Sequence, residues 1–151
     1  MDNVQIQQVF DISLFDISFL LEDSILDGHR HIQRLIDDYR SGKNRFTKSG
    51  ESLFIALLNY KMVGICGLNQ DPYNNLTFGR IRRLYVMKNY RKCGIGRLLV
   101  EAVIKEANGK FKKLILRTDN PIASIFYETL GFKATSEILN TTHIKEVEKG
   151  N

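Results

Sequence analysis

The hydrophobic positions of this chain follow two periods, which together predict a mixture of helices and strands. Apolar residues recur at helical spacing in some segments, and in others they alternate or form the short continuous runs typical of strands. The predicted helices cover residues 16–26, 28–39, 95–107 and 121–130; the predicted strands cover residues 52–59, 62–68, 78–86, 113–117 and 143–147, and a short one begins at Phe132.

Each predicted helix has an apolar face that we expect to be buried. Asn120 and Pro121 are typical of a helix start, and Gly109 and Gly131 are typical of helix ends. The expected buried positions are Leu20, Leu21 and Ile25 in the first helix; His31, Ile32, Leu35 and Ile36 in the second; Ile95, Leu98, Leu99, Ala102, Val103 and Ala107 in the third; and Ile122, Ile125, Phe126 and Leu130 in the fourth.

The strand at residues 78–86 contains an irregularity. Leu84 and Val86 alternate regularly, whereas Ile81 is out of phase by one residue, with Arg82 and Arg83 filling the gap. One extra residue in a strand is the signature of a β-bulge. The strand is followed by a loop, a helix and another strand, an order that predicts a parallel pair joined by a crossover. We therefore expect an α/β (α+β) fold, a mixed central sheet with a bulge in one strand and helices flanking it.

The loop between this strand and the next helix has features of an anion site. It reads Arg91-Lys92-Cys93-Gly94-Ile95-Gly96, and Arg97 follows. Glycines at such a junction let a ligand approach the backbone closely. The first turn of a helix adds free N–H groups and a partial positive charge. The loop is therefore predicted to hold a phosphorylated cofactor.

Two other nucleotide-binding motifs do not fit this loop. A dinucleotide-binding Gly-x-Gly-x-x-Gly motif would need glycine at position 99, which is Leu99, and would need its glycines directly after the strand. The predicted strand instead ends at Val86, well before Gly94. A Gly-x-x-x-x-Gly-Lys-Ser/Thr phosphate loop does not occur in the sequence.

Composition restricts the class of protein further. The 151 residues are 43% hydrophobic and 26% charged, as expected for one globular domain over residues 1–151. The sequence lacks an apolar run of the roughly 18 residues that span a membrane, and residues 1–10 do not resemble a signal peptide. Cys66 and Cys93 do not make a disulfide framework, and free thiols are typical of a reducing compartment. We expect a cytoplasmic protein that does not act at a membrane.

These features resemble the GCN5-related N-acetyltransferase (GNAT) superfamily over residues 78–134. Three separate elements carry the resemblance in the family's order and spacing. They are the strand residues Leu84-Tyr85-Val86; the loop motif Arg/Gln-x-x-Gly-x-Gly/Ala, matched by Arg91, Gly94 and Gly96; and Asn120-x-x-Ala123-x-x-x-Tyr127 followed by Gly131-Phe132.

The resemblance implies transfer of an acetyl group from acetyl-CoA to an amine by direct attack within a ternary complex. It implies that Tyr127 is the acid that protonates the departing thiolate, and that an N–H at the bulge polarises the thioester carbonyl. The implied cofactor-binding residues are Leu84, Tyr85, Val86, Arg91, Lys92, Cys93, Gly94, Ile95, Gly96, Arg97 and Asn120. Cys93 is interpreted as part of the loop rather than as a nucleophile.

The catalytic base is not evident from the sequence. Residues 72–100 contain no Asp, Glu or His, although many family members carry a Glu on the bulged strand or its neighbour. A water relay to solvent is one alternative to a side-chain base. The side-chain candidates elsewhere are Glu51, Asp71, Glu22, Asp23, Asp27 and His143.

Charge gives an expectation about partners. The net charge is +5, but the predicted N-terminal helices are acidic, with Glu22, Asp23, Asp27, Asp37 and Asp38. In this fold those helices usually wall the acceptor site, so a cationic amine is the expected acceptor. A homodimer is also expected, because dimers are common in the family, and no metal is expected because the three histidines form no ligand pattern.

Two other functions stay open at this stage. One is a CoA-binding regulatory module without turnover, which the missing strand acid favours. The other is a small basic nucleic-acid-binding protein. Nucleic acid is not the expected partner, because the basic residues gather around the glycine loop rather than along one helix face.

Overall fold

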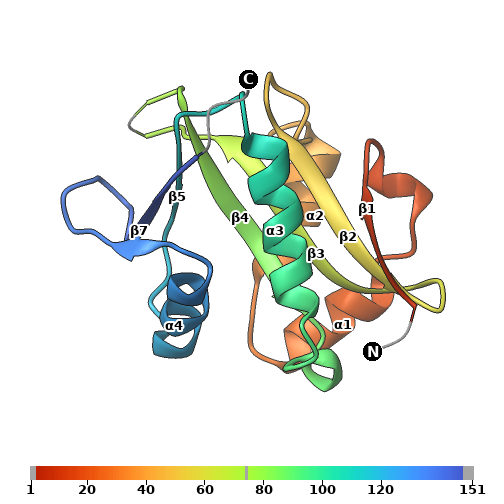
Figure 1. Ribbon diagram of the computed structural model, residues 1–151. Coiled ribbons are helices and arrows are strands. Elements are labelled where there is room, and N and C mark those ends of the chain that lie inside the picture. Colours follow the sequence, from red (N-terminus) through yellow and green to blue (C-terminus); the bar gives the residue numbers. More distant parts are fainter. Residues whose placement is uncertain (1–2, 74, 148–151) are drawn as a thin grey trace.

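The computed structural model describes residues 3–73 and 75–147, in which seven strands form one mixed sheet with helices on both faces (Figure 1). The strand order is β1-β2-β3-β4-β5-β7-β6. In chain order the elements are β1 (Val4–Gln8), the 3-10 turn η1 (Ile12–Leu14), α1 (Ser18–Leu26), α2 (His31–Ser41), β2 (Ser52–Leu58), β3 (Lys61–Gln70), β4 (Phe78–Val86), the 3-10 turn η2 (Lys88–Tyr90), α3 (Ile95–Ala107), β5 (Lys113–Leu116), α4 (Pro121–Thr129), β6 (Lys133–Ala134) and β7 (His143–Glu146).

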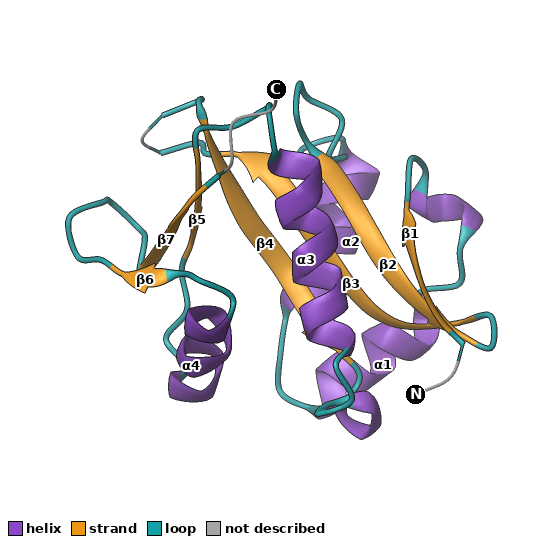
Figure 2. Cartoon of the chain, in the orientation of Figure 1, coloured by secondary structure: helices purple, strands orange, loops and turns teal. Residues whose placement is uncertain are grey.

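The pairing of the strands confirms the expected mixed sheet. Neighbouring strands from β1 to β4 are antiparallel, as are β5–β7 and β7–β6. The exception is the pair β4–β5, which is parallel because α3 carries the chain across the sheet between them. Helix α3 lies on one face of the sheet, and α1 and α2 lie on the other (Figure 2).

Gly64 of β3 and Gly96 of α3 lie where α3 packs against the sheet and α4. A Cβ atom at Gly64 would lie 3.0 Å from a methyl carbon of Leu99, so the Leu99 side chain would have to shift to make room for it. A Cβ atom at Gly96 would lie 3.5 Å from the ring of Phe126 in α4. Ile95 at the start of α3 is 1% exposed, which fixes the first turn of the helix against the core. The N-terminus of α3 is therefore held in place between the sheet and α4.

The bulge is confirmed in β4. Gly67 of β3 pairs with Arg82 and Ile65 pairs with Tyr85, so one residue of β3 faces two residues of β4. The two residues opposite Cys66 are Arg83 and Leu84, one position further along than the two arginines of the sequence pattern suggest. Arg83 has a φ of 61°, the left-handed conformation that lets the strand absorb the extra residue.

Several expected buried faces are wrong. Ile25 is 56% exposed, Ile122 78%, Ile125 63% and Leu98 44%. His31, also expected to be buried, is exposed. Helix α4 instead turns Tyr127 and Leu130 into the core, because it packs at the edge of the sheet and contacts it over a narrow strip. Strand β1 was not predicted, because it is only five residues long and has just two apolar residues, Val4 and Ile6.

The β2–β3 hairpin turns at Asn59 and Tyr60. Leu58 pairs with Lys61, and the two residues between them, Asn59 and Tyr60, have φ values of 50° and 66°. Positive φ at both positions is typical of a type I′ turn, for which Asn-Gly is the favoured sequence. Asn tolerates this conformation, whereas Tyr60 adopts it while fully exposed.

Tyr60→Gly is therefore expected to stabilise the protein by up to about 1 kcal/mol. A left-handed L-residue costs roughly 1–2 kcal/mol, and the greater freedom of glycine in the unfolded chain offsets part of the gain. Urea unfolding measures the difference, with Asn59→Gly as the matched control that should gain less. Equal stability of Tyr60→Gly and the parent protein would contradict this account of the turn.

Candidate functional site

The glycine loop joins β4 to α3 and leaves the first turn of α3 accessible. Lys92 and Gly94 have φ values of 64° and 84°, so the loop makes two left-handed turns before the helix begins. Gly94 is the N-cap and provides no side chain to bond the helix N–H groups. A Cβ atom placed on Gly94 would meet nothing within 4 Å in the described residues. The N–H groups of the first turn are therefore available to an anion.

Arg91 anchors the loop. Its Nε donates to the carbonyl of Val86 at 2.9 Å, and its Nη2 lies 2.6 Å from Oδ2 of Asp27. The guanidinium also lies 5.2 Å from the centre of the Tyr85 ring. The hydrogen bond from Arg91 lowers the pKa of the Asp27 carboxyl below its ordinary value. Arg91 thus ties the glycine loop to β4 and to the end of α1, and a direct contact with phosphate stays a prediction.

The remaining side chains of the loop lie at the surface. Lys92 and Cys93 are exposed, and the thiol of Cys93 lies 3.5 Å from the carbonyl oxygen of Arg91. Arg97 forms an ion pair with Glu101 one turn further along α3, at 2.8 Å between Nε and Oε1. Lys92 and Arg97 flank the N-terminus of α3, where positive side chains would add to the attraction of an anion.

Beside this loop, β4 and β5 separate. The two strands pair only at Phe78, Gly79 and Arg80, so the second half of β4 pairs with β3 alone. The N–H of Met87 donates to Val63 of β3 at 2.9 Å. Since N–H and C=O groups alternate sides along an antiparallel strand, Val86, which precedes Met87, directs its groups away from β3. An extended ligand could pair with these groups as an additional strand.

The side chain of Tyr85 points to the face of the sheet that α1 and α2 cover, away from α3. Its hydroxyl donates to Oδ2 of Asp23 in α1 at 2.6 Å, and the N–H of Lys88 donates to the same oxygen at 3.0 Å. Burial, and then the hydrogen bond with Asp23, raises the pKa of the Tyr85 phenol above its ordinary value. Tyr85 was predicted to bind the cofactor. Its side chain is directed toward α1, so only its backbone lies near the gap between β4 and β5.

Tyr127 lies in the core between α4 and the sheet. It is 6% exposed and makes edge-on ring contacts with Phe126 and Phe132. Burial raises the pKa of its phenol, and the thiol of Cys66 is close enough to add to the effect. Cys66 is the β3 residue opposite the bulge. Tyr127 therefore lies near the β3 residue that faces the bulge.

Asn120 and His143 position α4. The side chain of Asn120 accepts hydrogen bonds from the N–H groups of Ile122 and Ala123, which confirms its predicted capping role. His143 of β7 is 3% exposed, and its Nε2 lies 3.0 Å from the hydroxyl of Ser124 in α4. The bonding of both residues accounts for the orientation of the helix that carries Tyr127.

Most of the proposed base candidates are committed to other contacts. Glu51 accepts hydrogen bonds from Lys48, Asn69 and Gln70, and it closes the connection between α2 and β2. Asp71 forms a buried ion pair with Arg80, with 3.1 Å between Oδ1 and Nε. Glu22 is exposed. The acids nearest the end of β4 are Asp23 and Asp27, which bond Tyr85 and Arg91.

The sequence analysis missed the histidines of the α1–α2 connection. His29 stacks on His31 at 5.5 Å between ring centres, and it meets the Tyr85 ring edge-on at 6.0 Å. Both were considered as metal ligands, and His31 also as part of the buried face of its helix. Their place beside Tyr85 follows from the packing of α2 on β4 and of α1 on β3, for which the local sequence carries no signal.

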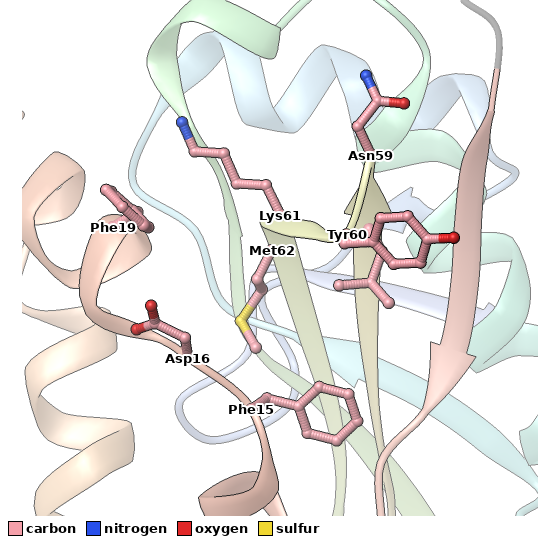
Figure 3. Close-up of a pocket in the computed structure, with 8 residues that line it drawn as sticks. Phe15, Asp16, Phe19, Asn59, Tyr60, Lys61 and Met62 are labelled. Carbon is pink, nitrogen blue, oxygen red and sulfur yellow. The ribbon is translucent and has the colours of Figure 1, made fainter.

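A separate pocket lies between the start of α1 and the β2–β3 turn (Figure 3). Its walls include Phe15, Phe19, Lys61 and Met62, and the Lys61 ammonium lies 5.1 Å from the centre of the Phe19 ring. None of the residues that line this pocket belongs to the predicted cofactor or catalytic set.

Comparison with known proteins agrees with this arrangement. The family model "Acetyltransferase (GNAT) domain" matches residues 49–134, which include the bulged strand, the glycine loop and Tyr127. The chain belongs to the GNAT acetyltransferase family. The match begins before β2, so it covers more of the chain than the motifs that carried the resemblance.

Individual relatives support the same family. A crystal structure of an acetyltransferase from Exiguobacterium superposes with a TM-score of 0.86 at 29% identity, covering 95% of this chain and 93% of that one. A GNAT-family acetyltransferase from Staphylococcus aureus has a TM-score of 0.75 at 20% identity over 97% and 100% of the two chains, which shows the shared fold.

The curated relatives match over shorter lengths. N-alpha-acetyltransferase 30 of Schizosaccharomyces pombe is 36% identical over 86 residues, or 54% of this chain and 57% of that protein. An acetyltransferase of Bacillus subtilis is 37% identical over 62 residues, or 39% of this chain and 40% of that protein. The chain thus spans about half the length of the curated relatives it matches.

The described residues contain neither a membrane-spanning helix nor a group of side chains suited to a metal ion. No helix in residues 3–73 and 75–147 is long and apolar enough to cross a membrane. Over the same part of the chain, no three side chains of His, Cys, Asp or Glu are grouped so that they could hold a metal ion.

Proposed function

We propose that this GNAT protein transfers an acetyl group from acetyl-CoA to an amine. The observation that carries the proposal is the convergence of two features at one end of β4. There, the glycine loop leaves the first turn of α3 open above Gly94, and β4 has separated from β5. A phosphate group and an extended arm could bind there together.

The residues present fit acetyl-CoA. The N–H groups at Gly94, Ile95 and Gly96 would bind its pyrophosphate. The backbone of Leu84 and Val86 would hold the pantetheine arm, with the Val86 carbonyl already bonded by Arg91. Bound acetyl-CoA supplies the acetyl group as a thioester. A backbone N–H at the bulge would orient and polarise the carbonyl of that group.

Tyr127 would act as the general acid. Its O–H would donate a proton to the sulfur of the leaving thiolate. A phenol whose pKa is raised by burial keeps its proton throughout the neutral range, so it is in the form that this step needs. The edge-on contacts with Phe126 and Phe132 would hold the Tyr127 ring in one orientation.

The acceptor would approach from the face of β4 covered by α1 and α2. An amine must lose a proton before it attacks, since amines have pKa values near 10. The expectation of a cationic acceptor depends on free acids on this face. Asp27 and Asp38, however, form ion pairs with Arg91 and Arg83, and Asp23 accepts from Tyr85 and Lys88. Three of the acids that motivated this expectation are thus already paired with groups of the protein.

Calorimetric titration with acetyl-CoA tests the cofactor assignment, with CoA, NADH and ATP as comparators. Selective binding of acetyl-CoA and CoA supports the proposal, and binding of neither contradicts it. An amine panel then separates an enzyme from a CoA-binding regulatory module, because only the enzyme forms acetylated product. A homodimer is a further prediction, which sedimentation analysis tests directly.

Thiol labelling provides a second test of the loop. Cys93 is exposed, whereas Cys66 is buried and its burial raises the pKa of the thiol to about 12. Iodoacetamide at neutral pH is therefore expected to modify Cys93 in the folded protein and Cys66 only after unfolding. Saturating acetyl-CoA should slow the modification of Cys93, as mass spectrometry of the labelled peptide will show. Labelling of Cys93 at the same rate with and without acetyl-CoA would contradict the loop assignment.

A further inference from the structure

A group of basic and imidazole side chains lies where the α1–α2 connection and α2 pack on β4. It consists of His29, His31, Arg34 and Arg83, and we call it the α2–β4 cluster. His29 and His31 stack on each other, and His29 also meets the ring of Tyr85. Arg83 is one of the two bulge residues. The cluster therefore lies beside the point in β4 at which the acetyl group would be held.

Arg83 is directed into the cluster by the bulge. Its left-handed φ of 61° is uncommon for a residue with a side chain. The side chain is only 12% exposed, so much of the guanidinium's water has been removed. Its acidic partner, Asp38 of α2, lies 3.8 Å away between Nη2 and Oδ2, which is too far for a hydrogen bond. The guanidinium therefore has donors left for a ligand.

Positive charge exceeds negative charge around Arg83. Burial and the charge of Arg82 lower the pKa of the Arg83 guanidinium. The charge of Asp38 raises it, but by less. Partial burial of the imidazole, followed by the charges of Arg83, His29 and Arg34, lowers the pKa of His31 below its ordinary value. The surroundings of His31 therefore disfavour a further positive charge.

The acids of the neighbouring helix do not cancel this excess. Asp27 forms its shorter ion pair with Arg91, at 2.6 Å, and lies 3.4 Å from Nε2 of His29. Asp23 is bonded to Tyr85 and Lys88. An anion placed among His29, His31, Arg34 and Arg83 would meet donors and positive charge without displacing either of these acids.

We propose that the acceptor amine carries an anionic group, a carboxylate or a phosphate, which the α2–β4 cluster binds. This inference rests on the proposed function. The anion would be held by Arg83 and Arg34, with the histidines as further donors. Its amine would then extend along β4 toward the bulge. The sign of the acceptor's charge is opposite to the one expected from the acidic composition of the N-terminal helices.

Acceptors that differ only in charge test the proposal. We would compare 3-aminopropanoate, 3-aminopropanol and 1,3-diaminopropane, which share one chain length, and O-phosphoethanolamine with ethanolamine. The anionic member of each set is expected to have a kcat/KM about 10–100-fold higher, since a hydrogen bond to a charged group contributes roughly 1.5–3 kcal/mol. The two sets separate a carboxylate site from a phosphate site. Equal rates, or a preference for the diamine, would overturn the proposal.

Charge variants locate the effect. Arg83→Gln and Arg34→Gln should each reduce the preference for the anionic acceptor about tenfold or more, chiefly through KM, while acetyl-CoA affinity stays the same. Arg34 is exposed on α2, so its variant should fold even if the change at the bulge does not. Arg40→Gln removes the same charge from the last turn of the same helix and serves as the matched control. An unaltered preference in Arg34→Gln and Arg83→Gln would overturn the assignment.

A readout without turnover separates this proposal from the proposed function. The pKa of His31, followed by NMR and assigned with His31→Gln, should rise when inorganic phosphate or 3-aminopropanoate is added, because a bound anion favours the imidazolium. A rise together with no acetylation of any amine would support the anion site and refute the enzyme activity. Acetylation of neutral amines with an unmoved His31 pKa would refute the anion site and leave the activity established.

Discussion

Gly94→Val is expected to weaken acetyl-CoA binding by on the order of 10²–10⁴-fold. The space above Gly94 is empty of protein atoms within 4 Å in the described residues, and in the proposed complex the pyrophosphate fills it. A valine side chain would occupy this space and deny the phosphates about two hydrogen bonds from the first turn of α3. A hydrogen bond to a charged group contributes roughly 1.5–3 kcal/mol, which gives the expected range. Isothermal calorimetry measures the affinity.

A control must separate the clash from backbone strain, because Gly94 has a φ of 84°. Gly42→Val provides it. Gly42 has a φ of 81° at the end of α2, and a Cβ atom there would meet only the tip of Arg45 at 3.8 Å. Both variants should lose similar stability in urea unfolding, and only Gly94→Val should lose acetyl-CoA. If Gly94→Val binds acetyl-CoA as tightly as Gly42→Val does, the pyrophosphate does not bind at this loop.

Tyr127→Phe is expected to lower kcat by about 10²–10⁴-fold, the usual contribution of a positioned acid. In residues 3–73 and 75–147 the Tyr127 hydroxyl has no hydrogen-bond partner, so its removal breaks no contact that supports the fold. We therefore expect acetyl-CoA affinity and the urea midpoint to stay close to those of the parent protein. Steady-state kinetics with a saturating acceptor measures the change.

The pH dependence gives the same mechanism an independent check. Burial raises the pKa of Tyr127, so the phenol stays protonated as the pH rises through the neutral range. An acid with a raised pKa loses activity only when the pH passes that pKa, so Tyr127 should cause no fall in kcat between pH 7 and about pH 10. Tyr60→Phe, which changes a fully exposed phenol, is the control for both measurements. A Tyr127→Phe enzyme with the parent's kcat would remove Tyr127 from the mechanism.

Local sequence was enough to predict most of the sheet and the glycine loop. Strands β2 to β5 and β7 could be predicted because each has an apolar pattern within its own sequence. The bulge could be found because one extra residue shifts the phase of Ile81 against Leu84. The helix ends at Gly109 and Gly131 were also readable, because glycine adopts the left-handed conformation found there without strain.

Helix faces were less predictable. An apolar stripe shows which side of a helix prefers burial, but α4 packs at the edge of the sheet, where it can bury only part of its apolar surface. Ile122 and Ile125 are exposed for this reason, and Tyr127, whose position alone favoured packing over catalysis, is buried. Strand β1 escaped detection because its pairing with β2 depends on a partner far along the chain.

The sequence by itself determined the family, the order of most elements and the position of the glycine loop. Each of these depends on neighbouring residues, whose spacing and conformational preferences are fixed before the chain folds. The tertiary structure alone decided which side chains meet. It paired Arg91 with Asp27, Arg83 with Asp38 and Tyr85 with His29, across stretches of chain that no local pattern connects. Electrostatic interactions act through space rather than along the chain, so the charge that an acceptor meets could be inferred only from the folded protein.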